Sequence, residues 1–187
     1  ELVVFTDANV LLDVAGIASL DRYFSDPSVG CIVGQLVYVN AAGSSTASVG
    51  SFYWRLEEKI KDLESGTGSV MGADGSIFVI RRSLFRIVPA DIIDDYYTSF
   101  NILCDGRRIA RAPELLAYER TAEKRGEEFR RKMRIACRSF NAHRILWPRL
   151  RRLPVLDLYK YVSHKLVRWL TALWLVLGLF SGLAFAY

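Results

Sequence analysis

Short apolar runs and longer segments with helical spacing follow one another along this chain. The apolar runs predict strands at 2–5, 31–39 and 77–80, and the first of these is expected to be a buried strand. Apolar residues that recur on one helical face predict helices at 15–24, 52–63, 96–104 and 122–146. Strands that alternate with helices in this way indicate an α/β domain.

Small residues, glycines and prolines mark the segments between these elements. The stretches "NAAGSSTASVGS" (40–51) and "ESGTGSVMGADGS" (64–76) are predicted to be loops. The segment 105–119 is predicted to form a turn and two short strands. Pro148 and Pro154 are expected to interrupt the chain before the final helices.

The C-terminal segment Trp169–Tyr187 is apolar and carries no charge. At ~1.5 Å per residue, a helix of this length covers roughly the 30 Å of a bilayer core, which predicts a membrane span. A buried core helix is the alternative.

The basic residues are concentrated near this segment. From His143 onward the chain has seven Lys or Arg residues and one acid, Asp157, whereas the rest of the chain has nearly no net charge. The positive-inside rule therefore places this flank and the preceding domain in the cytoplasm.

The cysteines provide no evidence for a metal site or a disulfide framework. Cys31, Cys104 and Cys137 are far apart and form no C-x-x-C pair. We interpret them as reduced core thiols of a cytosolic domain. The length of 187 residues fits one such domain, and 51% hydrophobic residues are ample for its core.

The first candidate site is "TDAN", in which Asp7 and Asn9 follow the apolar run 2–5. A carboxylate at the end of a strand points into the crevice where open α/β sheets bind ligands. Oxygen ligands two residues apart could hold a hard cation such as Mg²⁺ or Mn²⁺, which would neutralise a diphosphate leaving group. The alternative is that Asp7 caps the next turn and Asn9 is a turn residue.

The second candidate site is "IIDD", in which Asp94 and Asp95 begin a predicted helix. One of them could act as a general base if it faces a polar pocket and reaches an acceptor hydroxyl. The alternative is that both carboxylates only cap the helix, because helix N-termini favour negative charge.

Two further segments have features of a phosphate-binding or ligand-binding surface. Gly72 and Gly75 would let the backbone of the glycine-rich loop approach a ligand, although a tight turn is also possible. Four arginines share one face of the long predicted helix, where they would suit a diphosphate; the alternative is a solvated face with ion pairs to nearby glutamates. These arginines are Arg130, Arg131, Arg134 and Arg138.

Taken in order, these features resemble the membrane-bound family 2 glycosyltransferases. The closest likeness is to the cellulose synthase, hyaluronan synthase and poly-N-acetylglucosamine synthase group. It extends over essentially the whole chain, through "VVFTDAN", "VGCIVGQLVYVN", "FYWRLEEKI", "GSVMGADGSIFVIRRSLF", "IIDDY" and "SHKLVRW". The resemblance implies a partial GT-A-type mixed sheet with flanking helices, followed by interfacial and transmembrane helices.

The resemblance also divides the chain into three parts. Residues 1–147 would be the C-terminal portion of the GT-A domain, and the nucleotide-binding half is expected upstream of them. Residues 148–168 would be a basic amphipathic segment at the membrane surface, where Lys160, His164 and Lys165 suit the interface. Residues 169–187 would be the transmembrane helix.

Site roles are implied by the same resemblance. Asp7 and Asn9 stand where the family's D-x-D motif binds the metal of a nucleotide-sugar, as Mg²⁺ or Mn²⁺. Asp95 matches the catalytic base, and Asp94 matches its neighbour. The "GADG" motif corresponds to the loop that lines the acceptor side, and it contains Gly72, Ala73 and Asp74.

The segment "RRKMRI" falls where processive members carry Q-x-x-R-W. Arg134 is kept, Arg131 replaces the Gln, and Ile135 replaces the Trp that would stack on a growing glycan. The resemblance therefore assigns Arg131 and Arg134 to the diphosphate. It leaves single-sugar transfer to a lipid and polymer synthesis both open.

The implied function is inverting transfer of a sugar from a nucleotide-diphosphate-sugar to a glycan or lipid-linked acceptor. It would take place at the cytoplasmic face of the cell membrane, as in polysaccharide biosynthesis. Without the donor-binding half, the chain alone is expected to be inactive, and nucleic acid is not an expected partner. The alternative function is a non-catalytic, membrane-anchored interaction module, in which the carboxylates are only caps.

Overall fold

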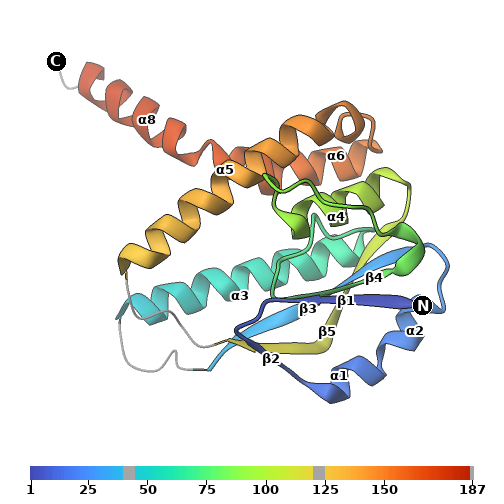
Figure 1. Cartoon of the computed structure of the whole chain (residues 1–187). Helices are drawn as coiled ribbons and strands as arrows, with labels where there is room; N and C mark the ends of the chain where they lie inside the picture. Colours follow the sequence, from blue (N-terminus) through green and yellow to red (C-terminus); the bar gives the residue numbers. More distant parts are fainter. Residues whose placement is uncertain (40–44, 120–124, 186–187) are drawn as a thin grey trace.

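The computed structural model describes residues 1–39, 45–119 and 125–185, and its centre is a five-stranded sheet (Figure 1). The order across the sheet is β1-β4-β3-β5-β2, in which β3 and β5 are parallel and the other neighbours are antiparallel. The sheet is therefore mixed. The strands are β1 (Leu2–Thr6), β2 (Val10–Leu12), β3 (Val29–Tyr38), β4 (Ile77–Arg81) and β5 (Arg108–Glu119).

Helices cover both faces of this sheet. The short helices α1 and α2 lie on one face, and α3, α4 and α5 lie on the other (Figure 1). The helices are α1 (Val14–Ala18), α2 (Leu20–Phe24), α3 (Ser45–Gly66), α4 (Asp94–Cys104), α5 (Arg125–Leu150), α6 (Val155–Tyr161), α7 (Val167–Trp169) and α8 (Thr171–Phe185). A 3₁₀ turn (Arg82–Leu84) follows β4, and a π-helical turn (Val162–Leu166) joins α6 to α7.

The central strands separate two hydrophobic cores because their side chains alternate between the faces of the sheet. Cys31 and Val33 of β3 pack with α4 and α5, whereas Ile32 between them packs on the side of α2. All three are fully buried. Full burial of a large aliphatic side chain contributes about 1.5–3 kcal/mol, so this alternation fixes which face each helix covers.

The prediction that β1 is buried was wrong. β1 pairs only with β4, which makes it an edge strand, and Val4 is 42% exposed. Only residues 7–9 separate β1 from β2, which lies at the other end of the strand order. The chain therefore turns sharply after β1, and Asp7 and Asn9 lie at this corner.

Several predicted boundaries also differ from the structure. Residues 45–51 belong to α3 rather than to a loop, and 40–44 lie outside the described residues. The segment predicted as two strands forms the single strand β5, whose pairing with β3 is irregular between Arg111 and Leu116. Pro148 lies inside α5, which continues past it to Leu150.

The predicted helix at 15–24 is divided at Ser19, whose backbone joins α1 to α2. The thiol prediction holds in part: all three cysteines are free, but only Cys31 is in the core. Cys104 is half-buried and Cys137 is exposed on α5.

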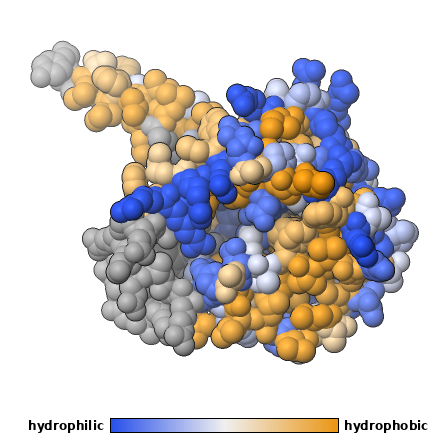
Figure 2. All heavy atoms as spheres, viewed as in Figure 1, coloured by the Kyte–Doolittle hydropathy of each residue, from blue (hydrophilic) through white to orange (hydrophobic). Residues whose placement is uncertain are grey.

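The C-terminal helices form a bent arm rather than one straight helix. Trp169 packs in the domain against Phe140 and His143, with ring centroids 5.2 and 5.7 Å away, so it is not part of the projecting segment. Figure 2 shows that the surface of α8, which projects from the body, is largely apolar. Within the described residues, no helix alone meets the length and hydropathy needed for a membrane span. One pair of helical segments meets this length and hydropathy only when the two are taken together, and the pair is bent by 63° between them. These segments are Val155–Trp169 and Leu173–Phe185.

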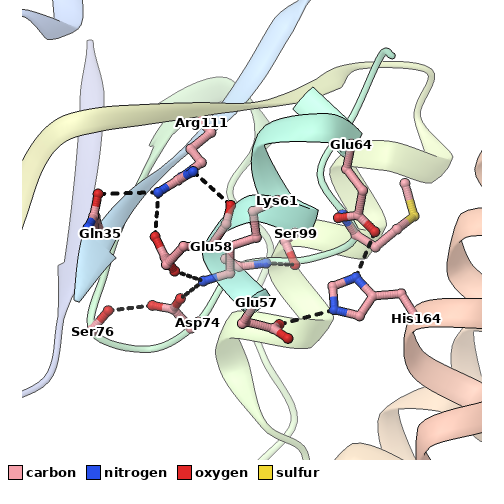
Figure 3. Close-up of polar contacts among 12 residues, drawn as sticks. Gln35, Glu57, Glu58, Lys61, Glu64, Asp74, Ser76, Ser99, Arg111 and His164 are labelled. Carbon is pink, nitrogen blue, oxygen red and sulfur yellow. Dashed lines mark hydrogen bonds and ion pairs between the residues drawn. The ribbon is translucent and has the colours of Figure 1, made fainter. Parts of the chain in front are cut away.

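A buried charge cluster fastens this arm to α3 (Figure 3). His164 Nδ1 lies 2.6 Å from Glu64 Oε1, and His164 Nε2 lies 3.0 Å from Glu57 Oε1. Arg168 donates to Glu57 at 2.7 Å, and the other Glu64 oxygen accepts the N–H of Met71 at 2.9 Å. The cluster therefore connects the C-terminal arm, α3 and the glycine-rich loop.

Lys160 adds to this attachment and does not face lipid headgroups as predicted. Its Nζ donates to the carbonyl oxygens of Glu64, Thr67 and Ser69 at 3.1–3.4 Å. His164 is likewise buried. These basic groups fix the arm to the domain, because a buried cation needs hydrogen-bond partners to replace water.

The two histidines of the chain have opposite pKa shifts. Burial acts to lower the pKa of His164, but its bonds to Glu57 and Glu64 raise it overall. Burial acts to raise the pKa of Glu57, but His164 and Arg168 hold it well below its usual range. His143, which bonds the Tyr161 hydroxyl at 2.5 Å, has a pKa lowered by burial.

We predict that the histidines contribute to stability over opposite pH ranges. The contribution of His164 is complete below its unfolded pKa of about 6.5 and is lost as pH rises through its higher folded pKa. The contribution of His143 is lost as pH falls below about 6.5. At pH 6, His164→Gln should lower the free energy of unfolding by about 1.5–3 kcal/mol, because a charged hydrogen-bond partner is lost.

Urea unfolding at a series of pH values tests this prediction. The difference in stability between the wild type and His164→Gln should shrink as pH rises above 6.5, whereas the difference between the wild type and His143→Gln should shrink as pH falls below 6.5. If the difference between the wild type and His164→Gln stays constant as pH rises, His164 is not the charged group described above.

Candidate functional site

Two carboxylates from distant parts of the chain meet across Gly75. A Cβ built on Gly75 would stand 3.4 Å from Asp7 Oδ2 and 3.6 Å from Asp95 Oδ2. Asp7 comes from the corner after β1, Asp95 from the first turn of α4, and Gly75 from the end of the glycine-rich loop. The absence of a side chain at position 75 leaves a space that both carboxylates face.

Asp95 is a candidate proton acceptor. It lies in the first turn of α4, whose N-cap is Ile93. Its Oδ1 accepts the backbone N–H of Tyr96 at 2.5 Å, so the alternative of a helix-capping role holds in part for Asp95, while its Oδ2 faces Gly75. The pKa of Asp95 is raised to about 7, mainly by burial and in part by the charges of Asp94 and Asp74, whereas the Tyr96 N–H and Lys165 act to lower it. A carboxyl with this pKa can exchange a proton near neutral pH.

Asp7 and Asn9 have different surroundings. Burial raises the pKa of Asp7, as do the charges of Glu119 and of other nearby carboxylates, while Arg131 acts to lower it. Asn9 Nδ2 donates to Glu119 Oε1 at 2.8 Å. Sequence reasoning missed Glu119, although it ends an apolar strand, the same signal that drew attention to Asp7.

The "GADG" loop is held mainly by contacts within the protein. Gly72 has φ +89°, and a Cβ there would stand 2.8 Å from the Phe100 ring. The Ala73 N–H donates to Ser99 Oγ at 3.1 Å. Of the predicted acceptor-side residues, Gly72 and Ala73 thus contact α4, while Gly75 faces the two carboxylates.

Asp74 is anchored by a buried ion-pair network beneath the loop (Figure 3). Lys61 Nζ lies 2.8 Å from Asp74 Oδ2 and 3.0 Å from Glu58 Oε1. Burial acts to lower the pKa of Lys61, but these two carboxylates raise it above its usual range. Ser76 donates its hydroxyl hydrogen to the other Asp74 oxygen.

Arg111 of β5 extends the same network into the sheet. Its guanidinium pairs with the carboxylates of Glu58 and Asp62 and donates to Gln35 Oε1 at 3.2 Å. The network therefore connects β3, β5, α3 and the loop. The sequence analysis did not predict the ion pairs of Lys61 or Arg111, because each residue pairs with a carboxylate that the sequence pattern does not relate to it.

The two predicted diphosphate-binding arginines differ in position. Arg131 lies near the corner after β1, with its Nη1 3.6 Å from Glu119 Oε1. Arg134 is exposed and forms no ion pair with the described residues. The structure thus places Arg131 near Asp7, while it does not relate Arg134 to either carboxylate.

The donor set at the corner fits a hard divalent cation in part. Asp7 provides a carboxylate and Asn9 an amide oxygen, which are the ligand types that Mg²⁺ and Mn²⁺ accept. Among the described residues, no group of three His, Cys, Asp or Glu side chains could hold a metal ion. These residues therefore suit a site that phosphate oxygens of a ligand complete, since Mg²⁺ often uses one or two carboxylates together with substrate phosphates.

Comparison with known proteins supports a relationship to glycosyltransferases. No protein-family model matches the chain. The chain is 26% identical to a protein of Rhizobium meliloti (strain 1021) named N-acetylglucosaminyltransferase. The alignment is 189 positions long and covers 94% of the chain. The chain spans 44% of that protein, which is less than half of its length.

The fold is similar to that of a solved glycosyltransferase. This structure is the mannosyltransferase PcManGT from Pyrobaculum calidifontis in complex with GDP-Man and Mn²⁺. The TM-score is 0.58 at 22% sequence identity, over 77% of this chain and 39% of the other. The likeness concerns the fold. The chain is thus a mixed α/β structure, with a sheet and flanking helices, of the kind found in a glycosyltransferase.

Proposed function

We propose that the chain supplies the catalytic base of an inverting glycosyltransferase of the family 2 type. The observation that carries this proposal is the meeting of Asp7 and Asp95 across Gly75. One carboxylate there has a pKa near neutrality, and the other belongs to the pair that suits a cation. The likeness to a protein named N-acetylglucosaminyltransferase supports sugar transfer as the reaction class.

In the proposed reaction, Asp95 takes the proton of an acceptor hydroxyl. The hydroxyl oxygen then forms a bond with the anomeric carbon of a nucleotide-diphosphate-sugar. The bond from that carbon to the diphosphate breaks on the opposite side, its electron pair leaves with the nucleoside diphosphate, and the configuration inverts. A general base of this kind typically contributes about 10²–10⁴-fold in rate.

The donor's diphosphate would lie at the corner after β1. Asp7 and Asn9 would hold a divalent cation, Mg²⁺ or Mn²⁺, which when bound neutralises negative charge on the leaving group. The structural neighbour was solved with GDP-Man and Mn²⁺, which supports this assignment. Arg131, near Asp7, and Arg134 would add positive charge toward the phosphates.

The acceptor is proposed to be a glycan or a lipid-linked sugar at the cytoplasmic face of the cell membrane, as in polysaccharide biosynthesis. Residues 1–147 would form the catalytic portion and 148–168 the attachment to the membrane surface. Of the expected span 169–187, Trp169 packs in the domain, so the membrane segment would comprise the residues that follow it. Support comes from apolar side chains that are exposed on the C-terminal helices, which include Val155, Leu156, Tyr159, Trp174, Leu175 and Phe180.

We predict that Asp95→Asn abolishes nearly all transfer by the full-length protein. The amide cannot accept the proton, so the rate should fall by about 10²–10⁴-fold. The measurement is the initial rate of transfer over a panel of nucleotide-sugars, together with the melting temperature, which should change little.

Asp94→Asn is the matched control for this prediction. It removes a neighbouring carboxylate at the same helix end, and it should cost much less activity than Asp95→Asn. A rate near wild type for Asp95→Asn would mean that this carboxylate is not the base.

We also predict that the exposed Cys137 lies on the cytoplasmic side of the membrane. A membrane-impermeant maleimide should label it in permeabilised cells and not in intact cells. Cys137→Ser identifies any signal that arises from Cys31 or Cys104. Labelling of Cys137 from outside intact cells would contradict the proposed location.

A further inference from the structure

Glu119 is a buried carboxylate beside the proposed cation site, and the reaction described above does not use it. Its side chain is 5% exposed. One of its oxygens, Oε1, accepts the amide hydrogen of Asn9 at 2.8 Å and lies 3.6 Å from Arg131 Nη1. Asn9 and Arg131 are the residues proposed to bind the cation and the diphosphate of the nucleotide-sugar. Glu119 is therefore placed to control the orientation of both side chains.

We infer that Glu119 is a positioning residue that fixes the orientation of the Asn9 amide. This inference deepens the proposed function and rests on it. An ionised carboxylate only accepts hydrogen bonds, so Asn9 must turn its NH₂ group toward Glu119. The amide oxygen, on the other side of the same carbon atom, is then directed away from Glu119 and is available to a cation.

Arg131 supports this arrangement by its charge. Its Nη1 lies 3.6 Å from the Glu119 Oε1 atom that accepts from Asn9, so the positive charge of Arg131 attracts this oxygen and helps to hold it in place. The same geometry explains why an amide suits position 9. A second carboxylate there would lie within hydrogen-bond distance of Glu119 with no proton between them, and like charges this close repel.

The inference makes Asn9 and Glu119 a coupled pair. Loss of an outer partner that orients a metal ligand typically lowers metal affinity by about 10–100-fold. Glu119→Gln should therefore weaken Mn²⁺ binding by this factor, because Gln can donate to Asn9 and allow its amide to turn. In an Asn9→Ala background the same substitution should have little further effect.

The test is a titration of the full-length protein with Mn²⁺, alone and with inorganic diphosphate present to supply phosphate oxygens. Free Mn²⁺ is measured by electron paramagnetic resonance against a protein-free control. Glu114→Gln is the matched control, since it removes a carboxylate from the same strand that instead bonds Tyr23 and Arg22. It should leave the affinity unchanged. Circular dichroism reports whether each variant folds.

A second variant covers the case in which Glu119→Gln does not fold. Asn9→Asp combined with Glu119→Gln keeps the hydrogen bond with donor and acceptor exchanged. This double variant should bind Mn²⁺ at least as tightly as the wild type. A loss of affinity in the double variant would overturn the inference.

The remaining outcomes separate this inference from the proposed function. If the wild-type protein binds Mn²⁺ neither alone nor with inorganic diphosphate present, the cation site itself is contradicted, and the inference with it. If the wild type binds and Glu119→Gln binds equally well, only the inference is overturned. A loss that persists undiminished in the Asn9→Ala background would also overturn it, because Glu119 would then act without Asn9.

Discussion

The arrangement of the site depends on the ion pairs of Lys61 with Asp74 and Glu58. This buried lysine joins α3 to the glycine-rich loop, and the loop places Gly75 between Asp7 and Asp95. Removing one partner of a buried pair typically costs about 3–5 kcal/mol, because the remaining charge is left uncompensated. The His164 cluster supports the start of the same loop through Glu64 and Met71, so the C-terminal arm is part of this support.

The same burial explains why Asp95 suits acid–base chemistry. A carboxylate that had lost its water and gained several fixed donors would have a low pKa, as Glu57 does. Asp95 instead receives one short backbone hydrogen bond and lies near other negative charges, so burial dominates and its pKa rises to about 7. The partnered carboxylates hold the fold together, while the poorly partnered Asp95 has the pKa that the proposed reaction requires.

Local patterns predicted the α/β class and the segments that meet at Gly75. Asp7 was found because a carboxylate ended an apolar run, and Asp95 because two carboxylates began a helix. The pairings of Lys61, Arg111 and His164 could not be found in this way, because His164 and Glu57 are 107 residues apart and only the fold relates them. The edge position of β1 was also missed, since a short apolar run does not reveal which strands flank it.

Adding one methyl group at Gly75 tests most directly whether the two carboxylates share one reaction space. The new Cβ of Gly75→Ala would make ordinary contacts of 3.4–3.6 Å with the carboxylate oxygens, so the fold should be kept. The methyl would displace ligand atoms by about 1 Å or more, and transfer by the full-length protein should fall about 10²-fold. Gly66→Ala, which has nothing within 4 Å, should keep the wild-type rate. A folded Gly75→Ala protein with the wild-type rate would contradict the account.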